Sequence, residues 1–66
     1  MEIVVNGQSR PVAPGTTVRG LLENLALPES RVAVERNRRI VPRRDFADVS
    51  LAEGDRIEIV TFVGGG

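Results

Sequence analysis

Only one segment of the chain has the apolar spacing of an amphipathic helix, and this limits the folds open to it. Its apolar residues recur at intervals of three and four positions: Val18, Leu21, Leu22 and Leu25. Thr16 or Thr17 can cap its start, and Pro28 stops any continuation. Gly20 inside it costs about 1 kcal/mol relative to alanine, which indicates close packing or a weak helix. We therefore expect a single main helix of about three turns.

The residues before this helix predict a β-hairpin. Asn6-Gly7 is the strongest short signal for a two-residue turn, and it separates a strand at residues 2–6 from one at 8–13. Because proline cannot donate to a central ladder, Pro11 places the second strand at a sheet edge.

The residues after the helix predict three more strands. Residues 31–36 alternate in polarity, Ile40-Val41 forms a short strand, and residues 56–63 form the last one, after a tight turn at Glu53-Gly54-Asp55. A single helical turn is expected in the connection that contains Phe46, Val49 and Leu51. This order predicts an α+β roll, a mixed sheet of about four to five strands with one main helix across one face.

Strand alternation assigns the apolar residues to two faces of this sheet. We expect six of them under the helix: Ile3, Val5, Val32, Val34, Ile57 and Ile59. The opposite face, which no second helix covers, receives Val4, Ala33, Val60 and Phe62. With Val63, the residues Val4, Val60 and Phe62 are candidates for partner docking. For Phe62 the alternative is that it folds over the sheet edge as additional core.

Composition argues against autonomous catalysis. The 66 residues include no His, Cys, Lys, Tyr or Trp, so the usual general bases and most nucleophiles are missing. Ser9, Ser50 and a few threonines remain, with nothing nearby in the sequence to activate them. The same absences argue against zinc, haem and iron–sulfur sites. We expect no catalytic residue, no metal and no bound cofactor.

Charge and hydropathy limit the kinds of partner that the chain can have. The first residues lack the basic start and long apolar stretch of a signal peptide, and no segment has the roughly 20 apolar residues that cross a bilayer. We therefore expect a cytoplasmic protein with no membrane contact. The formal net charge is zero, which argues against a general nucleic-acid binder. Five arginines do cluster within residues 36–44, but without Trp or Tyr as a stacking platform we interpret them as a solvated loop.

The end of the sequence carries the functional argument. The last predicted strand runs directly into Gly64, Gly65 and Gly66, which have no side chains to bury and add nothing to a core. We expect residues 1–63 to form the domain and residues 64–66 a flexible tail that reaches about 10 Å and can thread a narrow channel. A carboxylate is a poor electrophile until it is activated. Joining it to AMP provides a leaving group that sulfur can replace, giving a thiocarboxylate. The chain has no phosphate-binding loop, so a partner must supply the nucleotide chemistry.

Taken together, these segments resemble the ThiS sulfur carriers of thiamine biosynthesis, ubiquitin-like β-grasp proteins related to the molybdopterin-synthase small subunit. The resemblance covers nearly the whole chain, and its parts are Asn6-Gly7, Thr17-Val18, Leu21-Leu22, Leu25, residues 34–37, residues 40–43, Gly54-Asp55 and the terminal glycines. The run from Asn37 to Arg43, together with the Gly-Gly end, is the part most typical of the thiamine branch.

The resemblance implies a function and a set of partners. A ThiF-type enzyme would use ATP to adenylate Gly66, a sulfur-donating enzyme would supply the sulfur, and the thiazole synthase ThiG would use the resulting thiocarboxylate. Gly65 and Gly64 would serve in recognition of the tail. The family minimum is two glycines, so Gly64 is also a candidate spacer.

Other functions fit the same tail. A carrier that delivers sulfur to molybdopterin, cysteine or tRNA would share its chemistry, and a ubiquitin-like modifier would form covalent ladders on other proteins. From a different class, the arginine cluster would suit a nucleic-acid-binding module, and a purely structural interaction domain would keep its role without the glycines.

Overall fold

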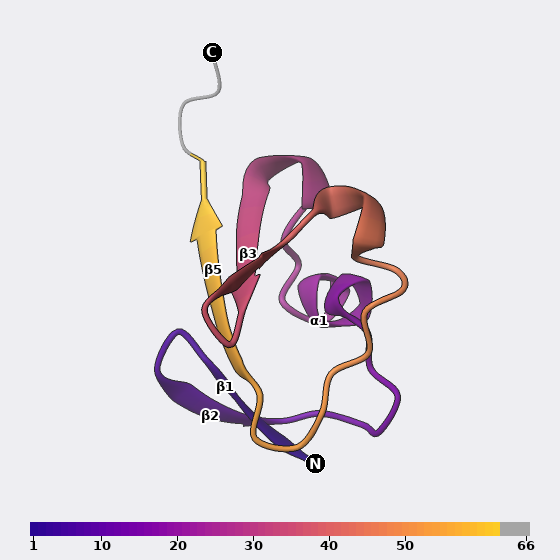
Figure 1. Cartoon of the computed structure of the whole chain (residues 1–66), viewed down its shortest axis with the longest axis vertical. Helices are drawn as coiled ribbons and strands as arrows, with labels where there is room; N and C mark the ends of the chain where they lie inside the picture. Colours follow the sequence, from indigo (N-terminus) through magenta and orange to yellow (C-terminus); the bar gives the residue numbers. More distant parts are fainter. Residues whose placement is uncertain (63–66) are drawn as a thin grey trace.

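The computed structural model describes residues 1–62, which form one five-stranded mixed sheet with a helix packed on one face (Figure 1). The strands lie in the order β2-β1-β5-β3-β4. The elements are β1 (Glu2–Val5), β2 (Gln8–Pro11), α1 (Val18–Asn24), η1 (Glu29–Arg31), β3 (Val32–Arg36), β4 (Arg39–Val41), η2 (Arg43–Asp45) and β5 (Arg56–Thr61). β1 and β5 are parallel neighbours at the centre, and the other pairs are antiparallel. The predicted α+β roll is confirmed.

Both hairpins of the sheet use the same turn. Val5 pairs with Gln8 across Asn6-Gly7, and Arg36 pairs with Arg39 across Asn37-Arg38. All four loop residues have positive φ, between 49° and 82°, as a type I′ turn requires. The first turn is the one that the sequence predicts. The second places an arginine in the left-handed region, where glycine is the favoured residue.

The helix begins where the sequence predicts but is shorter than expected. Thr17 is the N-cap, and its side chain accepts a hydrogen bond from the Gly20 amide at 3.1 Å. α1 has seven residues, about two turns, so the expected three turns are wrong. The helix ends before Pro28 because Ala26 takes a left-handed conformation, with φ of 58°. The amides of Ala26 and Leu27 then donate to the carbonyls of Glu23 and Leu22, which closes a Schellman motif.

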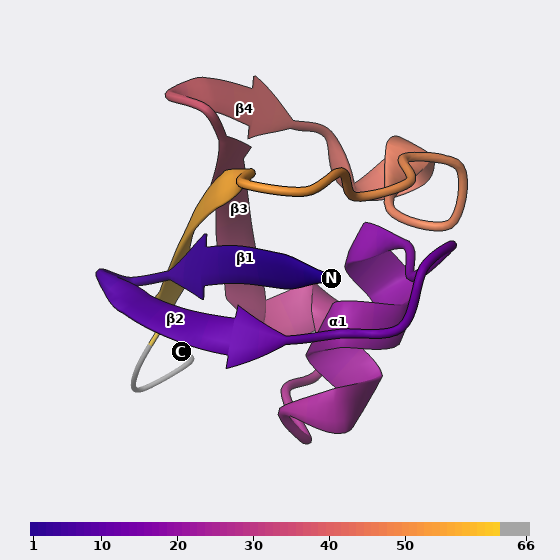
Figure 2. The same cartoon turned by 90° about the horizontal axis from the view of Figure 1, so that it is seen from below.

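The core lies between the sheet and α1 (Figure 2). All six residues that alternation assigns to this face are buried, including Ile57 and Ile59. Phe46 and Leu51 complete the core from the connection between β4 and β5. The sequence predicts a single helical turn in this connection, and the structure has one at η2. That prediction is confirmed.

Two strand ends differ from the predicted ones by two residues, and the other boundaries differ by at most one. β2 ends at Pro11 rather than at residue 13, and β5 is assigned only to Thr61, although the Phe62 amide still donates to the Arg31 carbonyl at 2.7 Å. β2 is an edge strand, as Pro11 predicts.

Candidate functional site

The candidate site begins at the end of β5. Thr61 pairs with Val32 of β3, and the Phe62 amide bonds to the carbonyl of Arg31, the residue just before β3. The predicted tail residues Gly64, Gly65 and Gly66, together with Val63, lie outside the described residues. β5, the strand that leads to the predicted tail, is therefore held in register by backbone bonds as far as Phe62.

An asparagine from the first hairpin extends the hold on β5. β1 pairs with β5 only at Val4 with Arg56 and Val5 with Ile57. Beyond that point the side chain of Asn6 acts as a further strand residue, accepting from the Ile59 amide at 2.8 Å and donating to the Ile59 carbonyl at 3.2 Å. These two bonds pair backbone groups of β5 where β1 has already turned away.

The start of β5 is held by a buried carboxylate. The Asp55 side chain, 7% exposed, accepts from Arg36 Nε at 2.8 Å, from the Ala52 amide at 2.8 Å and from Asn37 Nδ2 at 3.1 Å. Burial by itself raises the pKa of this carboxyl, but the three hydrogen bonds outweigh it and hold the pKa below its ordinary value. Asn37 also accepts from the Arg56 amide at 2.9 Å. Sequence reasoning missed this network.

The face of the sheet away from α1 exposes several apolar side chains. Val60 and Phe62 are 60% and 53% exposed, Ala33 is exposed and Val4 is partly buried. Phe62 is therefore not part of the core, which was the alternative for it. Ile40 on β4 is the most exposed large apolar residue of the described chain, at 75%, and sequence reasoning did not assign it to this face. Its register partner Glu35 is outward-facing, which indicates that Ile40 shares the side of Ala33 and Val60. We call these five residues the exposed apolar face.

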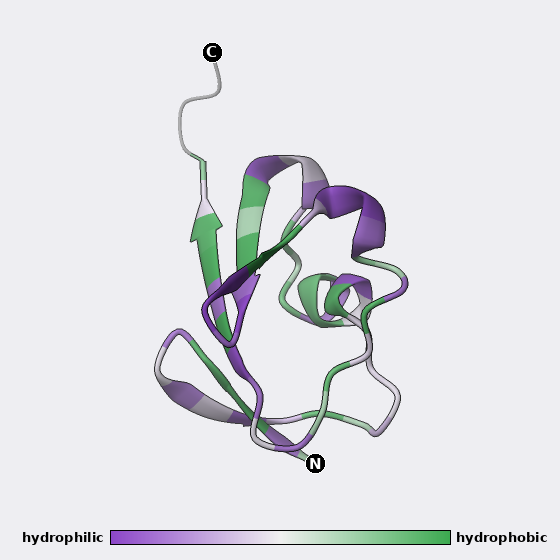
Figure 3. Cartoon of the chain, in the orientation of Figure 1, coloured by the Kyte–Doolittle hydropathy of each residue, from purple (hydrophilic) through white to green (hydrophobic). Residues whose placement is uncertain are grey.

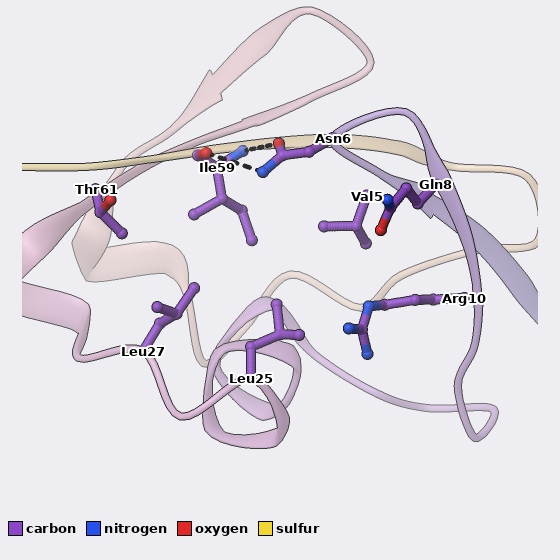
Figure 4. A pocket seen from close by; sticks show the side chains of 8 residues that line it. All are labelled: Val5, Asn6, Gln8, Arg10, Leu25, Leu27, Ile59 and Thr61. Carbon is purple, nitrogen blue, oxygen red and sulfur yellow. Dashed lines mark hydrogen bonds between the residues drawn. The ribbon is translucent and has the colours of Figure 1, made fainter.

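A groove of about 290 Å³ lies on the other side of the sheet, between the first hairpin and the end of α1 (Figure 4). Leu25, Leu27 and Ile59 point into it, and Arg10 and Gln8 lie at its far side. Thr61 lies at the opposite end of the groove from Gln8 and Arg10, so the groove also borders β5, the strand that leads to the predicted tail.

The five arginines of the predicted cluster belong to different elements of the fold. Arg36 is bound to Asp55, Arg38 and Arg39 lie at the second hairpin, and Arg43 and Arg44 belong to η2. Within residues 1–62 no group of three or more metal-ligating side chains is positioned to hold an ion. No helix in this range is long and apolar enough to span a membrane.

Comparison with known proteins identifies the family. The model of the ThiS family matches residues 3–66. The sulfur carrier protein ThiS of Escherichia coli is 36% identical over 66 residues, which cover 100% of both chains. A thiazole synthase of Paramagnetospirillum magneticum is 46% identical over all 66 residues, which cover 20% of that protein, so the chain spans about a fifth of this relative.

A solved structure gives the same answer for the fold. The crystal structure of the thiamine biosynthesis protein ThiS from Geobacter metallireducens superimposes with a TM-score of 0.84 and 33% identity over 100% of both chains. The expected ubiquitin-like β-grasp fold is confirmed by this match. With the family model and full-length relatives in agreement, the chain belongs to the ThiS family.

Proposed function

We propose that this chain is a sulfur carrier whose reactive group is the carboxylate of Gly66. A carboxylate oxygen attacks the α-phosphorus of ATP in a ThiF-type enzyme, and pyrophosphate leaves. A sulfur-donating enzyme and a thiol reductant supply hydrosulfide, which attacks the acyl carbon of the adenylate; the bond to AMP breaks, AMP leaves, and the thiocarboxylate remains after loss of the sulfur-bound proton. Thiazole synthase uses that sulfur to form the thiazole of thiamine. The chain contributes no catalytic residue, and ATP is consumed by the partner.

The observation that carries this proposal is the match to the ThiS family, which extends to Gly66. Two others support it. The relative from Paramagnetospirillum magneticum is named a thiazole synthase, and it includes a segment similar to the whole of this chain, which favours thiazole synthase as the acceptor. The composition, without His, Cys or Lys, favours a protein on which other enzymes act. All of these steps belong to the cytoplasm, where we place the protein.

The test is the intact mass of the protein after incubation with ATP, a ThiF-type enzyme and a sulfur source. We expect a mass increase equal to one exchange of oxygen for sulfur. The matched control lacks Gly65 and Gly66, and it should keep the stability of the parent within about 0.5 kcal/mol while gaining no sulfur. Sulfur gained by the truncated chain would contradict the assignment of Gly66, and covalent ladders on other proteins would indicate a modifier.

We also propose that the exposed apolar face is where partner enzymes hold the domain while Gly64 and Gly65 pass into their active sites. Val60 lies on β5 and Phe62 directly follows the strand, on the way to the tail, so docking and tail insertion would be coupled through β5. Val4 is at the other end of this face, and Val63 follows Phe62 directly. Phe62→Ala should weaken partner binding by about 1–3 kcal/mol, as for an interface anchor, with a smaller loss of stability. A large loss of stability with unchanged affinity would refute docking at Phe62.

A further inference from the structure

Two glutamates face each other on the exposed side of the sheet. Glu35 of β3 and Glu58 of β5 are direct register partners, and both are exposed. Like charges directly opposite each other on adjacent strands destabilise a sheet. Within residues 1–62 neither carboxylate has a cationic group within salt-bridge distance. No ion pair of the described residues therefore neutralises either carboxylate at close range.

A hollow of about 190 Å³ lies beside this pair. Its walls are Ala33, Val34, Ile40 and Val60, with the two glutamates at one side. Ile40 and Val60 are both more than half exposed, so the hollow is open to a partner. A hollow lined by apolar side chains and by two carboxylates suits a long side chain with an apolar stem and a cationic head.

Positive charge lies on the opposite side of the glutamates. Arg38 and Arg56, together with Glu35 and Glu58, line a second hollow of about 450 Å³. The exposed side of the sheet is thus divided into apolar, acidic and basic parts. Along the chain, Figure 3 shows hydrophobic residues in the upper parts of β3 and β5 and hydrophilic residues at the lower end of β3, the β3–β4 turn and the start of β5.

We propose that thiazole synthase docks on this face with an arginine or lysine whose stem fills the apolar hollow and whose cationic head binds between Glu35 and Glu58. This inference rests on the function proposed above. An apolar partner surface would desolvate two like charges without compensation, and an acidic surface would add to their repulsion. A cation relieves the repulsion that the free domain retains. Binding of a cation would therefore remove a repulsion in addition to forming ion pairs with the two carboxylates.

The order of the three parts also fixes the direction of docking. β5 leads to Phe62 at the apolar end, while Arg38 and Arg56 mark the other end. A partner with its cation at the glutamates and an acidic group beyond it can bind in one orientation only, because the reverse orientation opposes like charges. That orientation directs the end of β5, from which the predicted tail continues, to one side of the interface.

The experiment measures the affinity of the full chain for purified thiazole synthase by calorimetry at two salt concentrations. Glu58→Gln and Glu35→Gln should each lower the affinity about tenfold and reduce its dependence on salt, and Glu58→Arg should lower it about a hundredfold. The matched control is Glu23→Gln, on the exposed side of α1, which should bind as the parent does. Urea unfolding provides the second measurement: because the pair is repulsive, the glutamine variants should be at least as stable as the parent.

Three outcomes would overturn the proposal. They are an unchanged affinity in the glutamine variants, an equal loss with Glu23→Gln, and the absence of binding by the parent chain. Each is separate from the carrier function, because thiocarboxylate formation on Gly66 is measured independently by mass. A chain that gains sulfur but binds equally well with Glu58→Gln would retain its proposed function and lose only the cation site.

Discussion

Replacing Asp55 by asparagine tests the network that holds the start of β5. The substitution keeps the size of the side chain and changes its charge and one acceptor. Of the three hydrogen bonds that the carboxylate accepts, the amide oxygen of asparagine can keep only part, because its nitrogen would face donors. The Arg36 guanidinium would lose its counter-charge.

The expected cost follows from the burial of these groups. Hydrogen bonds to charged groups contribute about 1.5–3 kcal/mol each, and Asp55 is nearly fully buried. Arg36 is 33% exposed, so solvent screens part of the ion pair. We expect Asp55→Asn to lower the free energy of unfolding by about 2–4 kcal/mol at pH 7. A domain of this size has about 3–10 kcal/mol in total, and its melting temperature should fall by about 10–30 °C.

The effect should depend on pH in a defined direction. The pKa of Asp55 is lower in the folded protein than the ordinary value of about 3.9, so the stabilisation is complete above that value. As the pH falls through the folded pKa, the carboxylate becomes protonated and the stabilisation is lost. The difference between parent and variant should therefore be constant near neutrality and should narrow below about pH 4.

Urea unfolding followed by far-UV circular dichroism is the appropriate assay, since the chain has no Trp or Tyr for fluorescence. Asp48→Asn is the matched control, because Asp48 is exposed and its side chain accepts none of the protein's hydrogen bonds in the described part of the chain. Equal stability of Asp55→Asn and the parent at pH 7 would refute the network as a stabilising element. A difference that persists unchanged at pH 3 would show that shape, rather than charge, is responsible.

Three further predictions concern the helix and the core, and all are measured by the same urea unfolding. Ala26→Gly should stabilise the protein by about 0.5–1 kcal/mol, since the left-handed conformation at the C-terminal end of α1 suits glycine; a loss would contradict this local strain. Gly20→Ala should add about 0.5–1 kcal/mol, because the new Cβ would lie 3.5 Å from its nearest neighbours; a loss would indicate crowding. Leu22→Ala and Ile57→Ala, at fully buried positions, should each cost about 2–5 kcal/mol, and unchanged midpoints would contradict the assigned faces.

The fold could be predicted from the sequence where local chemistry and apolar spacing agree. Asn6-Gly7 allows little but a type I′ turn, and alternation alone assigned Ile57 and Ile59 to the core. The helix length was wrong because apolar spacing continues through Leu25 while the backbone has already begun to leave the helix. Ala26 carries no signal for a left-handed conformation, since that position normally requires glycine or asparagine. Tertiary packing, here the turn toward η1, overrides the local preference.

The site was predicted less completely, because its contacts connect residues far apart in sequence. Asn6 is hydrogen-bonded to Ile59, 53 positions away, and Asp55 to Arg36, 19 positions away. No local sequence pattern therefore predicts either pair. A signal did exist in the second hairpin. Asn37-Arg38 repeats the asparagine-first turn of Asn6-Gly7, and in both turns the asparagine side chain reaches β5. Ile40 was missed as an exposed residue because a strand of three residues has too little alternation to assign its face.

The distribution of polar side chains connects this fold to a carrier function. Asn6, Asn37 and Asp55 come from three different turns, and all three bind β5 or the turn that leads into it. A slip of one residue in β5 would exchange its buried and exposed faces, moving Ile59 to solvent and Val60 into the core. Hydrophobic burial already opposes such a slip, and the asparagine bonds oppose it further because they fit one register only. The proposed carrier function would require the exposed apolar face to keep a fixed relation to the end of β5, which leads to the predicted tail. The Asp55 carboxylate and the two asparagine side chains support this requirement, because all three bind β5 or the turn that leads into it.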